Sequence, residues 1–165
     1  MDKTSPIRVL VVEDNPDMVS ELQDFLALAE YPLFALDQAE RLETALRKIK
    51  EGKTDVILLD LGLPDSSGLE TFSRLQKSAG SIPIVIFTGL DDRDTAVEAV
   101  RMGAQDYLIK VNVDAGMLAR VLAYAVERKK AQLSLEKAYS ETEQLLSSLP
   151  SIFAKTSVYR TPGSP

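Results

Sequence analysis

The feature that most constrains the fold is an alternation of short apolar runs and longer segments with helical spacing over the first 110 residues. Runs that are apolar on both faces are typical of strands buried inside a parallel sheet. Between them, apolar residues recur at the spacing of a helix face, as at Met18, Leu22 and Phe25. The pattern predicts a doubly wound α/β domain with five strands, at Ile7–Val12, Leu33–Leu36, Val56–Leu59, Ile82–Phe87 and Tyr107–Ile109.

The ends of the expected helices carry the residues that such ends favour. Asn15 and Pro16 are typical of an N-cap followed by proline in the first turn. Gly52 and Gly103 lie where the second and fourth helices are expected to end, as glycines commonly do. These residues support the helix boundaries independently of the apolar spacing.

After Lys110 the pattern changes to a helix longer than the domain needs. Val113–Leu149 contains no proline and one glycine, and would extend about 55 Å as a helix. Ten residues with alternating spacings of four and three form what we call the heptad seam: Met117, Val121, Tyr124, Arg128, Ala131, Leu135, Ala138, Thr142, Leu145 and Leu149.

The heptad seam favours a homodimer through the C-terminal helix. Two alternatives stay open, an amphipathic helix packed back on its own domain and a helix frayed outside its parent protein. We therefore expect a domain at 1–126, a helical or coiled-coil linker at 127–149, and a tail at 150–165. The tail resembles the start of a truncated following domain.

Composition excludes several functions for this 165-residue chain. It has no Cys and no His, which removes disulfides, zinc fingers and Ser-His-Asp catalysis. Its net charge of −6 and the lack of a basic stripe argue against nucleic-acid binding within the chain. No apolar run is long enough to cross a membrane and the start is not a signal peptide, so we expect a cytoplasmic protein without a membrane partner.

Polar residues follow four of the five expected strands. Glu13 and Asp14 come after the first strand, and Asp60 after the third. Thr88 follows the fourth strand and Lys110 the fifth. The carboxyl ends of parallel strands meet at one edge of a sheet, so these side chains are expected to converge. Three neighbouring carboxylates need a cation, and oxygen ligands favour Mg²⁺ or Mn²⁺. Asp60 would then be a nucleophile toward a phosphoryl group.

These residues lie in four segments that resemble the CheY-like receiver domain of two-component response regulators. The resemblance covers about residues 6–126 and implies a flavodoxin-like sheet with strand order 2-1-3-4-5. Four segments in the family's order are more specific than any single motif. They are 9–15 (VLVVEDN), 58–68 (LLDLGLPDSSG), 86–89 (IFTG) and 103–110 (GAQDYLIK).

The resemblance implies a magnesium-dependent phosphoacceptor rather than an enzyme. Asp60 resembles the phosphoacceptor, with Mg²⁺ or Mn²⁺ bound beside it. Asp14 corresponds to a direct metal ligand and Glu13 to one that acts through water. The backbone carbonyl of Gly62 resembles the third protein ligand.

The resemblance also implies a switch and a partner. Thr88 resembles the switch hydroxyl, Lys110 the phosphate-binding lysine and Tyr107 the switch aromatic. A sensor histidine kinase or a phosphotransfer protein would supply the phosphoryl group. The signal would pass over the face of helix four, strand five and helix five to a downstream module or a dimer interface.

The sequence departs from the family at a few positions. Val111 follows Lys110 where members usually carry proline, and a non-proline cis bond is costly, so a trans bond is expected. Glu13 stands where many members have aspartate. Gly62 and Leu90 lack polar side chains that could align a hydrolytic water, which predicts slow self-dephosphorylation.

Alternative functions remain beside the phosphoacceptor. One is a phosphorylation-independent pseudo-receiver that dimerises through the long helix, which the acidic pair, Asp60 and Lys110 argue against. Another is a haloacid-dehalogenase-like phosphatase, but no second acid follows Asp60 at the spacing of that family. Residues 144–152 also resemble the entry to a PAS domain, as in linkers that lead into a sensor or kinase module.

Overall fold

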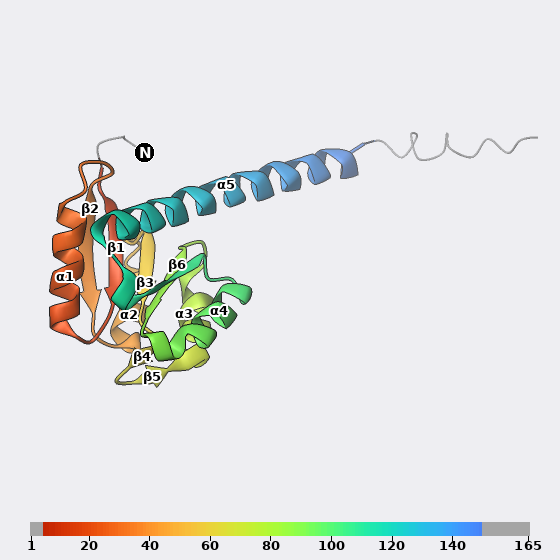
Figure 1. Ribbon diagram of the computed structural model, residues 1–165. Coiled ribbons are helices and arrows are strands. Elements are labelled where there is room, and N and C mark those ends of the chain that lie inside the picture. The colour runs from red at the N-terminus through yellow and green to blue at the C-terminus, as the bar shows by residue number, and fades with distance from the viewer. Residues whose placement is uncertain (1–4, 150–165) are drawn as a thin grey trace, which may run out of the picture. The chain divides into compact units, whose positions relative to one another are not determined.

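The computed structural model describes residues 5–149, and its elements alternate as the sequence predicts (Figure 1). The strands are β1 (Ile7–Val12), β2 (Phe34–Ala39), β3 (Val56–Leu59), β4 (Gly62–Leu63), β5 (Ser66–Ser67), β6 (Ile84–Thr88) and β7 (Asp106–Ile109). The helices are α1 (Pro16–Ala27), α2 (Leu42–Lys50), α3 (Gly68–Ala79), α4 (Arg93–Arg101) and α5 (Ala115–Ser147), with short 3₁₀ turns η1 (Leu90–Asp92) and η2 (Lys110–Asn112).

Five strands form one parallel sheet in the order β2-β1-β3-β6-β7. Counting only these five strands along the chain gives 2-1-3-4-5, so the predicted doubly wound topology is confirmed. The chain reverses direction across the sheet between β1 and β3, which are hydrogen-bonded neighbours. A reversal of this kind leaves a crevice at the carboxyl ends of the two strands.

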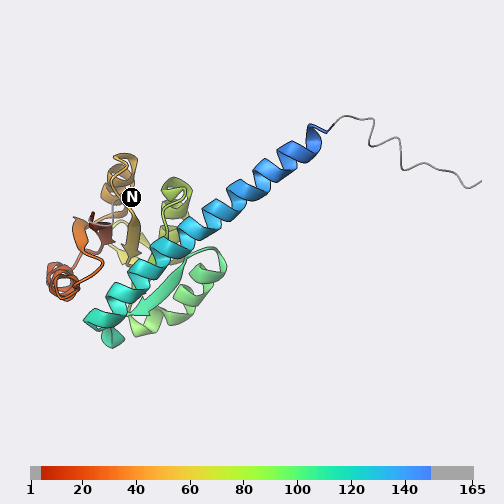
Figure 2. The same ribbon diagram turned by 90° about the horizontal axis from the view of Figure 1, so that it is seen from above.

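The core consists of two layers of buried side chains, one on each face of the sheet. Figure 2 shows from above how the helices flank the sheet. Along β3, Val56 and Leu58 pack toward α1 and the first part of α5. Ile57 and Leu59 pack toward α2, α3 and α4 on the other face. Successive strand residues point to opposite faces, so a strand buried on both must be apolar throughout.

Strand β2 runs three residues beyond its predicted end at Leu36. It lies at an edge of the sheet, and its exposure alternates along its length. Asp37 and Gln38 interrupt the apolar run because this strand is not buried on both faces. The apolar criterion therefore identified β2 but not its length.

The predicted helix ends are confirmed. The Asn15 side chain accepts hydrogen bonds from the backbone N–H groups of Asp17 and Met18 at the start of α1. Gly52 and Gly103 follow the last turns of α2 and α4 with positive φ values of 70° and 118°. A Cβ at position 103 would lie 2.5 Å from the side-chain nitrogen of Gln76, which can shift, so the positive φ is the main reason that position 103 favours glycine.

Strands β4 and β5 form a two-stranded antiparallel hairpin that the sequence did not predict. Each strand has two residues, too few for a detectable alternation. The hairpin follows Asp60 directly, and the Gly68 N–H donates to the Leu61 carbonyl at 2.8 Å to close its base. The main consequence is a fixed loop beside the end of β3.

Helix α5 is continuous over 33 residues, in agreement with the predicted long helix. Its residues divide between two compact units, one ending at Lys130 and the other beginning at Ala131. Leu118, Leu122, Ala125 and Val126 are buried in the first unit, whereas every described residue from Ala131 onward is exposed. Within residues 5–149, no helix has both the length and the apolar character that crossing a membrane requires.

The predicted tail at 150–165 lies outside the described residues. So does the end of the PAS-like segment, from Pro150 to Ile152.

Candidate functional site

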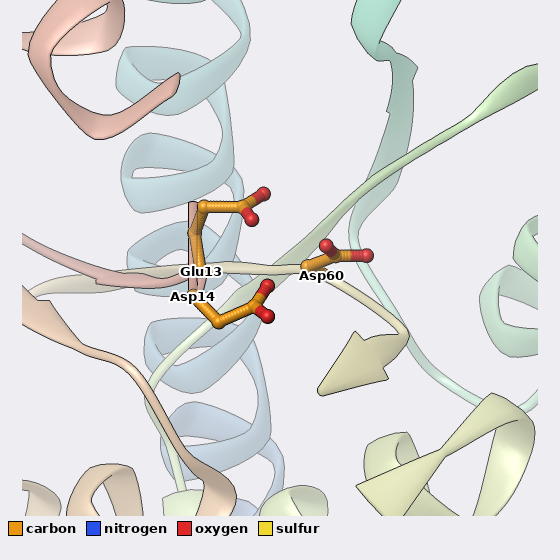
Figure 3. Close-up of side chains that lie close together, drawn as sticks. All are labelled: Glu13, Asp14 and Asp60. Carbon is orange, nitrogen blue, oxygen red and sulfur yellow. The ribbon is translucent and has the colours of Figure 1, made fainter. Parts of the chain in front are cut away.

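Three carboxylates converge at the carboxyl end of the central strands. Glu13 and Asp14 follow β1, Asp60 follows β3, and the last residues of these strands, Val12 and Leu59, are paired in register. Each of the three side chains offers a carboxylate oxygen, and these oxygens all lie within 4.8 Å of one another. Figure 3 shows the three side chains close together, with the Glu13 and Asp14 carboxylates on the side that faces Asp60. The convergence predicted from the strand ends is present.

Lys110, at the end of β7, provides the positive charge of the site. Its Nζ atom donates to Glu13 Oε2 at 2.5 Å and to Asp60 Oδ2 at 2.7 Å. Glu13 is 1% exposed and Asp60 7%, so both carboxylates are largely removed from solvent. A buried carboxylate is costly unless it is paired, and one ammonium group serves both. Lys110 also lies 5.5 Å from the centre of the Phe87 ring, within cation–π distance.

Burial and crowding change the acid–base properties of this cluster. Burial raises the pKa of Glu13, the charge of Asp60 adds to this rise, and the hydrogen bonds from Lys110 and Asn15 only partly oppose it. Burial acts against the charged form of Lys110, but its hydrogen bonds to Asp60 and Glu13 prevail and raise its pKa. The ammonium group is thus held in its charged form beside an acid that resists ionisation.

The hairpin positions one end of Asp60. The backbone N–H of Gly62 donates to Asp60 Oδ1 at 3.0 Å. A Cβ at position 62 would meet that same Oδ1 at 3.9 Å, which is ordinary van der Waals contact. Each Asp60 oxygen therefore has one donor, Gly62 for Oδ1 and Lys110 for Oδ2.

Thr88 and Tyr107 lie on the neighbouring strands β6 and β7. Thr88 is fully buried, and its hydroxyl has no hydrogen-bond partner among the described residues. Buried hydroxyl groups usually have a hydrogen-bond partner, so the Thr88 hydroxyl is a donor available to a group that enters the site. Tyr107 is half-buried and borders an open hollow that is also lined by Leu90, Asn112 and Met117.

The donor set fits a hard divalent cation. The available ligands in the cluster are carboxylate oxygens, and this chain has no cysteine and no histidine. Carboxylate oxygens whose negative charge is not fully balanced favour a hard cation such as Mg²⁺ or Mn²⁺. Three carboxylates against one ammonium group leave the cluster with an excess of negative charge.

The Lys110–Val111 peptide bond is trans, as the missing proline led us to expect, since the cis bond among the described residues is Tyr31–Pro32. Val111 itself is 76% exposed beside the site. Two further contacts near the sheet ends had no signal in the sequence. Asp65 accepts hydrogen bonds from the start of α2. Arg8 pairs with Asp55 at the opposite end of β1.

Together the doubly wound sheet and the acidic cluster with its lysine define a CheY-like α/β signalling domain. The chain belongs to the response regulator receiver domain family, whose model matches residues 9–122. The resemblance noted from the sequence is therefore confirmed, and the chain carries a receiver domain of two-component systems.

Curated relatives agree with this assignment. The transcriptional regulatory protein PrrA of Mycobacterium tuberculosis is 36% identical over 73% of this chain and 50% of its own length. The transcriptional regulatory protein KdpE of Mycobacterium tuberculosis is 34% identical over 82% of this chain and 58% of its own length. The chain thus spans about half the length of the curated relatives it matches.

Solved structures show the same fold. A response regulator receiver domain protein from Clostridium thermocellum matches with a TM-score of 0.67 and 27% identity. The match covers 76% of this chain and 98% of that protein.

Proposed function

We propose that this domain accepts a phosphoryl group on Asp60 from a sensor histidine kinase or a phosphotransfer protein. The observation that carries the proposal is the cluster of Glu13, Asp14 and Asp60 with Lys110 at the carboxyl edge of the sheet. Membership of the receiver family supports it, because receivers act in two-component signalling. We place this proposed function in the cytoplasm.

The transfer needs little more than positioning. An Asp60 carboxylate oxygen attacks phosphorus, the P–N bond of the donor phosphohistidine breaks, and the imidazole leaves with that electron pair. Lys110 holds Asp60 in place before transfer and can follow a phosphoryl oxygen afterwards, since its ammonium group reaches both acids. Glu13, Asp14, Asp60 and the Gly62 carbonyl would hold the metal. When bound, Mg²⁺ would neutralise phosphoryl oxygens as charge develops on them.

The response to phosphorylation is assigned to Thr88 and Tyr107. The buried Thr88 hydroxyl, which has no partner among the described residues, is a donor available to a new acceptor at Asp60. Its movement would free space for the Tyr107 ring to turn inward. The surface formed by α4, β7 and α5 would change as a result. The new charge on Asp60 would thus favour one of two arrangements of this surface.

The proposal is tested by incubation with acetyl phosphate or beryllofluoride and Mg²⁺. With acetyl phosphate, the wild-type chain should gain one phosphoryl group, detected by intact mass, and acetate should leave, whereas Asp60→Asn should gain none. Beryllofluoride carries no phosphoryl group and should instead give an NMR spectral change that needs Mg²⁺ and Asp60. A folded wild-type chain that shows no Mg²⁺-dependent signal would refute it and favour the pseudo-receiver.

We further propose that residues from about 127 to 149 pair with a second copy of the chain as a coiled coil. Leu135 and Leu145 on the heptad seam are 73% and 70% exposed, and large apolar side chains at this spacing favour a partner helix. Leu133 lies off the heptad seam on the same helix and is 39% exposed, so it provides a matched control.

Sedimentation velocity tests the dimer. Leu135→Asp should convert a dimer to a monomer, whereas Leu133→Asp should leave the dimer in place. A wild-type chain that sediments as a monomer, both with and without beryllofluoride, would refute the paired helix without affecting the phosphoacceptor proposal.

A further inference from the structure

Helix α2 begins without a capping side chain of its own. Its N-cap residue is Arg41, whose backbone is extended and whose side chain makes no capping hydrogen bond. The first N–H groups of a helix lack partners inside it and need an acceptor. Asp65 supplies one from more than twenty residues away, accepting from Leu42 N at 2.9 Å through Oδ1 and from Glu43 N at 3.1 Å through Oδ2.

Asp65 belongs to the hairpin that follows the phosphoacceptor candidate. It lies in the turn between β4 and β5, where Leu63 pairs with Ser66. The far side of the hairpin is fixed to α3 because the buried Thr71 hydroxyl donates to Ser66 Oγ at 2.8 Å. Asp65 therefore links this hairpin to the opposite neighbour, α2.

The last residues of β2, just before α2, contact the other half of the acidic cluster. The Glu13 N–H donates to the Ala39 carbonyl at 3.0 Å, and the Gln38 side chain donates to the Glu13 carbonyl at 3.3 Å. The segment from Gln38 to Glu43 thus contacts the β1 end directly and the β3 end through Asp65. It fixes the spacing of the two halves that supply the proposed metal ligands.

The charge of Asp65 suits this position. Burial acts slightly against its ionised form, but the N–H groups of Leu42 and Glu43 prevail and hold the pKa of Asp65 below its usual range. The carboxylate is therefore ionised at neutral pH, where a negative charge at a helix N-terminus is favourable. Its hydrogen bonds are charge-assisted and stronger than those of a neutral amide.

We propose that Asp65 is a positioning residue for metal binding, acting by holding the hairpin that carries Gly62 at the start of α2. This inference rests on the proposed function, because it concerns the Mg²⁺ that the acidic cluster would bind. Residues that orient metal ligands by direct contact change affinity by about 10–100-fold when removed. Asp65 acts through the backbone of the hairpin, so its removal should weaken Mg²⁺ binding by about three- to tenfold.

The experiment separates positioning from simple helix capping. Asp65→Ala removes both hydrogen bonds, and adding Arg41→Ser gives α2 a local cap, because serine is a favourable N-cap residue in extended backbone. Mg²⁺ affinity is measured by calorimetry and stability by urea unfolding. We expect the double variant to regain stability while its Mg²⁺ affinity stays as low as that of Asp65→Ala.

Two controls fix the interpretation. Glu43→Gln removes a negative charge from the same corner without removing either backbone donor, and should leave Mg²⁺ affinity unchanged. The Gly62 amide signal in NMR spectra should shift in both variants that lack Asp65. Recovery of Mg²⁺ affinity in the double variant, or unchanged affinity in Asp65→Ala, would overturn the inference. Failure of the wild-type chain to bind Mg²⁺ would instead overturn the proposed function.

Discussion

The two ends of the central sheet carry ion pairs of opposite character. At the amino end, Arg8 of β1 meets Asp55, which precedes β3. The Arg8 backbone N–H and guanidinium group donate three hydrogen bonds of 2.8 to 3.0 Å to the Asp55 carboxylate. At the carboxyl end of the same two strands, three carboxylates share the single ammonium group of Lys110.

The difference separates a structural ion pair from a binding site. The Arg8–Asp55 pair balances its charges and uses both carboxylate oxygens, so it needs nothing further. The carboxyl end retains excess negative charge, a buried acid with a raised pKa and the unpartnered Thr88 hydroxyl. Unsatisfied groups cost stability, and proteins keep them mainly where function needs them.

The largest expected effect is that Mg²⁺ stabilises the folded domain by binding at the carboxyl end of the sheet and not at the amino end. A ligand that binds the folded state alone stabilises it by about 2.7 kcal/mol at a hundredfold excess over its Kd. Urea unfolding with and without Mg²⁺ should show this gain in the wild-type chain and an equal gain in Asp55→Asn. A gain that Asp55→Asn abolished would mean that the two ends are not independent.

The next effect is the loss of the amino-end pair. Asp55→Asn should lower the free energy of unfolding by about 1–2 kcal/mol at pH 7, because it removes charge-assisted bonds while Arg8 stays partly exposed. Thermal or urea unfolding without Mg²⁺ measures this cost. An unchanged free energy of unfolding would show that the Arg8–Asp55 pair does not contribute to stability.

The stability difference between the wild-type chain and Asp55→Asn should also disappear in acid. The hydrogen bonds from Arg8 outweigh the effect of burial and lower the pKa of Asp55. A lowered pKa contributes stability above the ordinary aspartate value of about 3.9, and that contribution disappears as pH falls through the folded-state pKa. The difference between wild-type and Asp55→Asn should therefore be constant above about pH 5 and shrink below pH 4.

The smallest expected effect is a gain in the stability of the metal-free protein, whereas loss of the Arg8–Asp55 pair lowers stability. Asp14 is exposed and makes no side-chain hydrogen bond in the described residues, so Asp14→Asn removes repulsion without removing a contact. The metal-free protein should gain about 0.5 kcal/mol of stability, while its response to Mg²⁺ is lost. A loss of stability without Mg²⁺ would contradict the idea that this end is strained by charge.

The sequence predicted the sheet because β3 is apolar at every residue and β6 at every residue before Thr88, a pattern that few other folds require. It predicted which residues would converge because parallel strands bring their ends to one edge, as found for Glu13, Asp14, Asp60 and Lys110. Their individual roles remain proposals. The contacts of Asp65 with α2 and of Asp55 with Arg8 could not be predicted, because they depend on tertiary packing. A single aspartate carries no local signal for a helix end or an arginine that is distant in the sequence.

The unpartnered hydroxyl of Thr88 has a consequence for how far a signal can move the population of the domain. A buried donor left without a partner costs about 1–3 kcal/mol. An arrangement that satisfies it would therefore be favoured by roughly five- to 150-fold over one that does not. Under the proposed function, one side chain of β6 accounts for a shift of that size, so Thr88→Val should leave a domain that accepts phosphate but responds weakly to it.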